Sequence, residues 1–233
     1  MSLRELQTLY GSDASAAEQR GAFRTGEIPV GVYGLGKMGL PLAAVYAETC
    51  GNVVGADVDP AVVAGVVRGA CHVDREPDLA ILRAVAEDVA AGLEQGDLVV
   101  VECTVPPGTA REELLPLLVE ESRLDRGEFG LAVCPERTSS GRALEDIRGA
   151  YPKVVGGVDD ESGRVAALVY GELTSNEVIE VPSATAAEAV KVFEGVYRDV
   201  NIALANELAT LADAMDVNVN AAIETANTQP FCD

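Results

Sequence analysis

Six residues with glycine at the first, third and sixth places follow a short apolar run and suggest cofactor chemistry. They are Gly34, Leu35, Gly36, Lys37, Met38 and Gly39. In this pattern the first glycine permits a tight turn, the second lets the backbone approach a pyrophosphate, and the third lets a helix pack on a strand. The N–H groups at the start of that helix attract phosphate. We therefore predict that these residues bind a dinucleotide.

A carboxylate stands where such a turn requires one. Asp57 follows Gly34 by 23 residues and ends a second apolar run, 52–57. There it would accept hydrogen bonds from a ribose diol and repel a 2′-phosphate, which favours NAD over NADP. The competing interpretation is an ordinary glycine turn with an incidental aspartate.

Four polar residues of the C-terminal third share one helix face at spacings of three, four and three: Lys191, Glu194, Arg198 and Asn201. Lysine is scarce, since the chain otherwise has only Lys37 and Lys153. A partly buried ammonium could stabilise an oxyanion or bind a phosphate. The alternative is a solvated face of ion pairs.

Further candidates directly follow two strand-type runs, where doubly wound sheets carry their chemistry. Glu136 and Arg137 come after the run 130–134, and Thr104 comes after 97–102. Glu136 could position water or act as an acid or base, Arg137 could meet an anion, and Thr104 could hydrogen-bond the cofactor or water. Both segments could equally be plain strand-ending turns.

The elements that would position these residues alternate between strand and helix. Strand-type runs cover 28–33, 52–57, 97–102, 130–134, 153–157 and 177–181, and helical patterns cover 40–49, 60–68, 78–93, 111–122 and 161–171. This order predicts an α/β fold with a Rossmann-like, doubly wound parallel sheet, in which 52–57 is a buried strand.

From residue 183 the pattern becomes one helix of about thirty residues. Thr185 and Glu188 suggest a capping box at its start. Its apolar stripe holds Phe193, Val196, Val200, Leu204, Leu208, Leu211 and Met215, and a short helix follows near 220–225. We expect an N-terminal extension over 1–27, a cofactor-binding domain over 28–182 and a helical region over 183–233.

Composition limits the classes of partner. The net charge is −21, which argues against nucleic acid and anionic membranes. No apolar run is long enough to span a bilayer, so we expect a cytoplasmic protein. An acidic chain with few lysines favours a salt-loving source over an ordinary acidic protein. The five cysteines are dispersed and the chain has one histidine, so we expect no metal site.

Several segments together resemble the nucleotide-sugar 6-dehydrogenases, the group that includes UDP-N-acetyl-D-mannosamine and UDP-glucose dehydrogenases. They read GLGKMGLPLA, VVVECTVPPGT, CPERTSSGRALEDI, KVVGG and AAEAVKVFEGVYRDVNIALANELA. The resemblance covers about residues 28–230. It implies oxidation of the C6 alcohol of a UDP-sugar to the uronate by NAD, for polysaccharide biosynthesis, through a cysteine-bound thioester.

The resemblance also implies roles for individual residues. Lys191 would stabilise the oxyanion, and Glu136 and Thr104 would position water and substrate. The 34–39 turn and Asp57 would hold NAD, with Thr104 close to it. Arg137, Arg198 and Asn201 would join Glu136 and Lys191 in binding substrate, and the long helix would build a homodimer.

Three departures from the family pattern have consequences. The nucleophilic cysteine of the family lies in a Gly-Gly-His-Cys type motif shortly beyond the segment that matches Ala226–Pro230 here. Cys232 lies before the place of that motif, so we do not assign it as the nucleophile and expect no complete oxidation by this chain alone. After Cys71 about forty residues, two strands of the family, have no counterpart, so we expect an incomplete sheet. Gly195 stands where the family usually has a substrate-binding Asn.

Two other functions remain open. A β-hydroxyacid-type dehydrogenase would use Lys191 for a single hydride transfer and need no cysteine. A non-catalytic, dinucleotide-binding fragment that dimerises would need neither.

Overall fold

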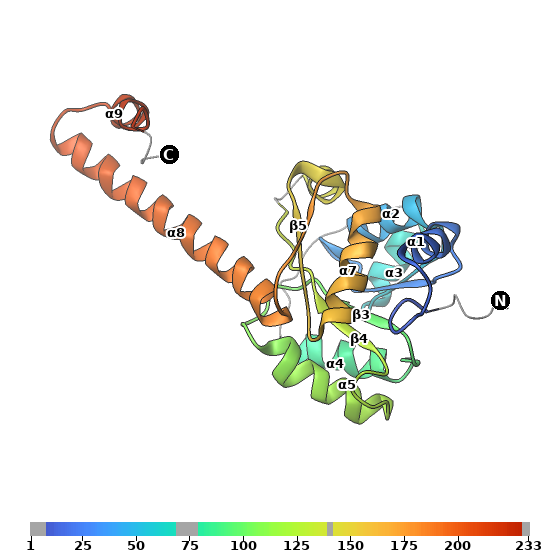
Figure 1. The fold of residues 1–233 in the computed structure, drawn as a ribbon. Coiled ribbons are helices and arrows are strands. Elements are labelled where there is room, and N and C mark those ends of the chain that lie inside the picture. Colours follow the sequence, from blue (N-terminus) through green and yellow to red (C-terminus); the bar gives the residue numbers. More distant parts are fainter. Residues whose placement is uncertain (1–7, 69–78, 139–141, 230–233) are drawn as a thin grey trace. The chain divides into compact units, whose positions relative to one another are not determined.

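The chain divides within one long helix into two units. The computed structural model describes residues 8–68, 79–138 and 142–229. The first unit is Met1–Lys191 and the second is Val192–Asp233. Figure 1 shows the elements of each.

A two-stranded parallel sheet begins the first unit. It consists of β1 (Val30–Tyr33) and β2 (Val53–Ala56), with Val30 opposite Val53. Helix α2 (Gly39–Thr49) crosses from one strand to the other, and α3 (Pro60–Val67) follows β2. Asp59 caps α3 by accepting a hydrogen bond from the Ala61 N–H at 2.8 Å, with Pro60 at the first helical position.

The prediction that β2 is buried was wrong. In the described part of the chain β2 pairs only with β1, and Val54 is 66% exposed. A parallel strand needs neighbours and covering helices on both faces to be buried. The open edge agrees with the incomplete sheet expected from the sequence, and the junction near Cys71 itself lies outside the described residues.

A four-stranded sheet in the order β3-β4-β5-β6 forms the rest of this unit. The strands are β3 (Leu98–Val101), β4 (Gly130–Val133), β5 (Lys153–Gly157) and β6 (Val178–Glu180). The pairs β3–β4 and β5–β6 are parallel, as predicted, whereas β4–β5 is antiparallel. The described connection between β4 and β5 holds only α6 (Ala143–Glu145) and the π-helical turn η2 (Asp146–Ala150), and an antiparallel pair needs no full crossover helix.

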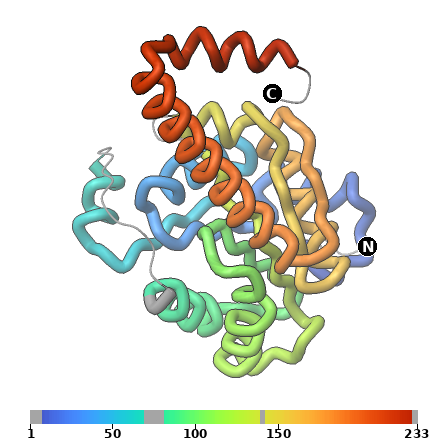
Figure 2. The backbone as a smooth tube through the Cα atoms, turned by 90° about the vertical axis from the view of Figure 1, so that its left-hand side faces the viewer, coloured from blue at the N-terminus to red at the C-terminus, as the bar shows by residue number. Residues whose placement is uncertain are grey.

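Helices cover both faces of this sheet. Helix α7 (Asp160–Leu173) packs with α1, α2 and β1 over one face, where Ala132 of β4 points. Helices α4 (Leu79–Ala90) and α5 (Leu115–Ser122) lie side by side over the other, where Leu131 and Val133 point (Figures 1 and 2). This alternation along β4 is what a strand between two layers requires. The doubly wound α/β class is thus confirmed.

The N-terminal segment is part of this core. Helix α1 (Ala16–Thr25) begins with a capping box between Ser15 and Glu18. Its Phe23 is 1% exposed and meets Tyr46 of α2 edge to face, with ring centroids 6.3 Å apart. Arg24 pairs with Glu172 of α7. Helix α1 therefore packs into the first unit.

Helix α8 (Ala184–Ala214) confirms the long helix. Its N-cap is Ser183, whose hydroxyl accepts a hydrogen bond from the Ala186 N–H at 3.1 Å. The predicted Thr185–Glu188 capping box was wrong, because the helix starts earlier and Glu188 points elsewhere. Helix α9 (Val219–Ala226) follows in the second unit, capped by Asn218. None of the described helices is long and apolar enough to cross a membrane.

Candidate functional site

The glycine-rich turn has the geometry that its sequence predicts. Gly34 has a φ of +87°, which favours glycine. A Cβ on Gly39 would lie 1.6 Å from the Gly34 carbonyl oxygen, so helix α2 can approach the turn only with glycine there. A Cβ on Gly36 would meet no atom within 4 Å. The turn is therefore closed at Gly39 and open at Gly36, where a pyrophosphate would approach.

The start of α2 can accept an anion. No side chain of the described residues caps this helix at Met38. First-turn N–H groups left without a side-chain cap, together with the helix dipole, attract phosphate. The Lys37 side chain is exposed beside them. These features fit the pyrophosphate of a dinucleotide.

Asp57 joins the glycine turn to the end of β2. Its Oδ2 accepts a hydrogen bond from the Leu35 N–H at 2.7 Å, and its Oδ1 accepts one from the Asp59 N–H at 2.9 Å. Each carboxylate oxygen has a second lone pair, so the half-buried Asp57 can still accept from a ribose hydroxyl. The residues present therefore fit the adenosine half of NAD.

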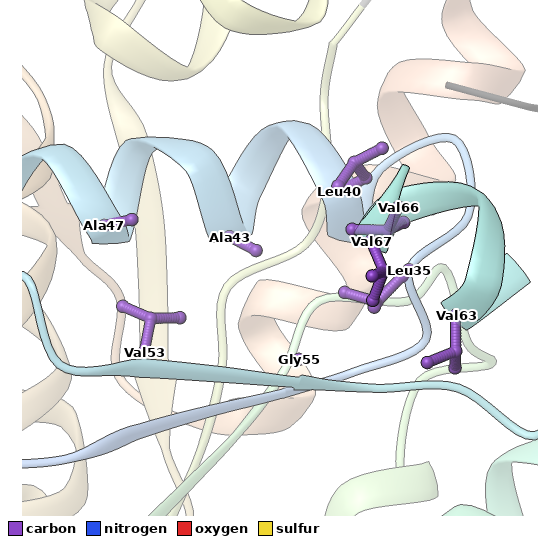
Figure 3. A pocket seen from close by; sticks show the side chains of 9 residues that line it. All are labelled: Leu35, Leu40, Ala43, Ala47, Val53, Gly55, Val63, Val66 and Val67. Atoms are coloured by element: carbon purple, nitrogen blue, oxygen red, sulfur yellow. The ribbon is translucent and has the colours of Figure 1, made fainter. Parts of the chain in front are cut away.

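A cavity of about 260 Å³ lies next to this turn between α2, α3 and β2 (Figure 3). Leu35 projects into this region over Gly55, where an added Cβ would come within 2.8 Å of its Cδ2. The lining is aliphatic apart from Gly55: Leu35, Leu40, Ala43, Ala47, Val53, Val63, Val66 and Val67. Since these side chains cannot bind ribose or phosphate, this cavity does not fit those parts of a dinucleotide.

Lys191 and Glu136 come together. The Lys191 ammonium lies 3.8 Å from Glu136 Oε2, and each side chain is 20% exposed. The second carboxylate oxygen of Glu136 accepts a hydrogen bond from the Thr138 N–H. The pair is longer than a hydrogen bond, so ammonium protons remain available to a third group. This geometry suits the stabilisation of a negatively charged oxygen.

Backbone and side-chain contacts place this pair beside the cofactor turn. The Thr138 hydroxyl lies 3.3 Å from the sulfur of Met38, so the loop after β4 contacts the glycine turn. The Glu136 N–H donates to the Glu102 carbonyl at 3.0 Å, which joins the loops after β3 and β4. Thr104 is exposed on the first of these loops.

The other predicted substrate residues have their own partners. Arg137 donates to the Pro152 carbonyl at 3.1 Å and stacks over Tyr151, with its guanidinium carbon 5.3 Å from the ring centroid. In the second unit Arg198 pairs with Glu194 at 2.8 Å, and Asn201 donates to the Tyr197 carbonyl at 2.8 Å. A Cβ on Gly195 would meet no atom within 4 Å.

A buried polar cluster that the sequence did not indicate lies behind the site. Tyr170 of α7 donates a hydrogen bond to the Glu102 carboxylate. Burial raises the pKa of Glu102, while Lys153 and the Tyr170 hydrogen bond oppose the shift and Glu136 adds to it. Burial also raises the pKa of the Cys103 and Cys134 thiols, so neither is set up as a thiolate nucleophile.

Glu188 is a second residue whose role sequence reasoning missed. It is 1% exposed, and its carboxylate accepts hydrogen bonds from the backbone N–H groups of Gly108 and Ala110. The available signal was its place three residues before Lys191 in an otherwise small and apolar stretch. The contact spans about 80 residues of sequence, which local patterns do not reveal.

Comparisons with known proteins agree on the family. Residues 70–174 match the NAD-binding domain of the UDP-glucose/GDP-mannose dehydrogenase family, and residues 185–233 match its central domain. UDP-N-acetyl-D-mannosamine dehydrogenase of Pyrococcus horikoshii is 33% identical over 86% of this chain and 58% of its own length. The enzyme of that name from Methanocaldococcus jannaschii is 36% identical over 69% of this chain and 36% of its own length. A solved structure of the Pyrococcus horikoshii protein superposes with a TM-score of 0.80 at 32% identity, over 88% of this chain and 58% of that one.

The alignments support the internal gap. The match to the Pyrococcus horikoshii enzyme has 245 aligned positions but uses 86% of 233 residues, about 200, so about 45 positions of the relative have no counterpart here. The NAD-binding domain match begins only at residue 70, after β1 and β2. The chain spans 58% to 60% of the length of three curated relatives that it matches. With the glycine turn, the Lys191–Glu136 pair and both family domains in place, this chain belongs to the UDP-glucose/GDP-mannose dehydrogenase family.

Proposed function

We propose that this chain forms the cofactor-binding and central part of an NAD-dependent dehydrogenase that oxidises the C6 alcohol of a UDP-sugar to the uronate. The observation that carries the proposal is the Lys191–Glu136 pair beside the glycine turn, joined to it by the Met38–Thr138 contact. The names of the relatives, UDP-N-acetyl-D-mannosamine dehydrogenases, support the substrate class.

NAD, when bound, would accept the hydride that leaves C6. The open backbone at Gly36 and the start of α2 would hold the pyrophosphate, and Asp57 would accept the ribose hydroxyls. Thr104 would hydrogen-bond the cofactor or a water molecule from the loop after β3.

The chain's own groups would stabilise charge on the substrate oxygen. The Lys191 ammonium would donate to the C6 oxygen as the C6 hydroxyl loses its proton to a water molecule that Glu136 positions, and Glu136 would also hold the ammonium. The substrate would contact Arg137, Arg198 and Asn201. Each of these side chains would first have to give up the hydrogen bond or ion pair that it makes within the protein. We further propose that the exposed stripe of α8 forms a homodimer, and that the protein works in cytoplasm rich in salt.

Binding measurements on the 233-residue chain test the proposal directly. Isothermal titration should show NAD binding, weaker NADP binding, and UDP-N-acetylmannosamine or UDP-glucose binding in the presence of NAD. Asp57→Ala should weaken NAD binding about tenfold, the loss of one good hydrogen-bonding partner for the ribose. Equal affinity for NAD and NADP, or no UDP-sugar binding, would contradict it.

The same preparation separates the two alternatives. NADH formation from a small β-hydroxy acid but not from a UDP-sugar would favour the β-hydroxyacid class. The solved 3-hydroxyisobutyrate dehydrogenase among the similar structures is 21% identical and shows only a shared fold. NAD binding with no UDP-sugar binding would favour a non-catalytic fragment.

A further inference from the structure

We infer that Glu188 is a positioning residue, which fixes Lys191 against Glu136 by tying helix α8 to the loop after β3. The inference rests on the proposed function only in giving Lys191 a chemical role. The Gly108 N–H donates to Glu188 Oε2 at 2.5 Å and the Ala110 N–H donates to Oε1 at 2.8 Å. Both carboxylate oxygens are thus used by one loop.

That loop has a shape that presents these two amides. The Pro106 carbonyl accepts from the Thr109 N–H at 3.2 Å and from its hydroxyl at 2.7 Å, and Gly108 has a φ of +103°. Pro at the second place and a left-handed Gly at the third are typical of a type II turn. The turn leads into η1 (Ala110–Leu114), so the carboxylate also lies at the positive end of a helical segment.

The same helix face carries Glu188 and Lys191, which are one turn apart. Ala184 and Ala187 of this first stretch are fully buried against the core beneath α4 and α5. Packing of these two methyl groups sets how closely α8 approaches the core. Alanine side chains are too short to interlock with their neighbours, so they restrain rotation of the helix about its axis poorly. The two hydrogen bonds of Glu188 supply the restraint, and they thereby set the direction in which Lys191 leaves the helix.

A neutral, isosteric replacement tests this without substrate. Glu188→Gln keeps the size of the side chain but offers one acceptor to two N–H groups. Hydrogen exchange of the Gly108 and Ala110 amides should accelerate at least tenfold. Because the chain has only three lysines, 13C reductive methylation gives a sparse NMR spectrum in which Lys191 is assigned by Lys191→Arg. The Lys191 signal should move in Glu188→Gln in the same direction as in Glu136→Gln, and the double variant should show no added shift.

Glu120→Gln, an exposed carboxylate of α5, is the matched control and should change neither readout. Faster exchange at Gly108 with an unmoved Lys191 signal would overturn the inference and leave Glu188 as a loop cap alone. If Glu188→Gln is too unstable for NMR, Glu188→Asp, which is one carbon too short to reach both amides, gives the same comparison. These signals are measured without NAD or UDP-sugar. If the chain bound neither ligand, the proposed function would fail, but the result for Glu188 would still hold.

Discussion

The Lys191 ammonium lies 3.8 Å from the Glu136 carboxylate, although the two residues belong to different elements and are 55 positions apart in sequence. Both are 20% exposed, so the pair is neither a screened surface contact nor a fully desolvated one. An ammonium in such a place is poised to donate to an incoming oxygen anion. The first two predictions below concern this pair and the cofactor turn beside it.

Removing the ammonium should abolish chemistry with little cost to folding. Lys191→Ala should lower UDP-sugar-dependent NADH formation at least about 100-fold, the loss typical of one oxyanion-stabilising donor. UDP-sugar affinity should fall while NAD affinity and the melting temperature stay unchanged. Arg126→Ala removes an exposed charge of the same sign and should leave all four quantities as in the wild type. For a chain that shows no turnover, the fall in UDP-sugar affinity alone decides, and an unchanged affinity would contradict the assignment.

Two glycines of the cofactor turn should respond differently to alanine. At Gly36 the added Cβ meets only open space, so Gly36→Ala should fold as stably as the wild type but bind NAD at least about tenfold more weakly. At Gly39 the Cβ would lie 1.6 Å from the Gly34 carbonyl oxygen, so Gly39→Ala should lower the melting temperature as well. Differential scanning calorimetry and NAD titration measure both effects. Unchanged NAD affinity in Gly36→Ala would place the pyrophosphate elsewhere.

Some of this site could be read from local sequence, and some could not. The turn at Gly34 and the length of α8 depend on residue type and on spacing within one element, so the sequence predicted both. The contact of Glu188 with Gly108 joins residues that are 80 positions apart, and the contact of Glu102 with Tyr170 joins residues that are 68 positions apart. No local pattern indicates either contact. The burial of β2 was predicted wrongly because a run of valines shows what a strand can bury, not whether neighbours exist.

The β4–β5 pairing shows the same limit. The sequence of β5 is apolar and short, and it fits a parallel or an antiparallel neighbour equally well. Only the connection between the strands distinguishes the two, and a connection without a regular helix gives no periodic signal. Strand existence was therefore predictable, whereas strand direction was not.

Glu102 should give the protein a measurable pH dependence. Burial raises its pKa, with Lys153 and Tyr170 opposing the shift and Glu136 adding to it. A carboxyl whose pKa is higher in the folded state costs stability as the pH rises from its ordinary value of 4.5 through the raised value. Glu102→Gln should therefore gain in free energy of unfolding relative to the wild type between pH 4.5 and 8, measured by urea titration at each pH. Glu120→Gln should show no such trend, and a trend of the opposite sign would mean that the ionised Glu102 is stabilised by Lys153.

The charge of the whole chain leads to a prediction about salt. A net charge of −21 repels itself in the folded state, and counter-ions screen this repulsion. Raising KCl from 0.1 M to 2 M should raise the melting temperature, measured by circular dichroism. Sorbitol at equal osmolality should raise it less, because it does not screen charge. A melting temperature that falls with KCl would contradict our proposal that the protein works at high salt.

The apolar stripe of α8 should hold two copies of the chain together. Within the second unit Val200 is 59% and Leu204 is 55% exposed, and a helix with such a stripe needs a partner in water. Sedimentation velocity should show a dimer for the wild type and a monomer for Val200→Asp and Leu204→Asp, with helical content retained by circular dichroism. Asn206→Asp adds the same charge on the opposite face of the helix and should leave the dimer intact. A wild-type monomer at 100 µM would refute dimerisation through this stripe, and a dimer that survives both stripe variants would place the interface on another surface.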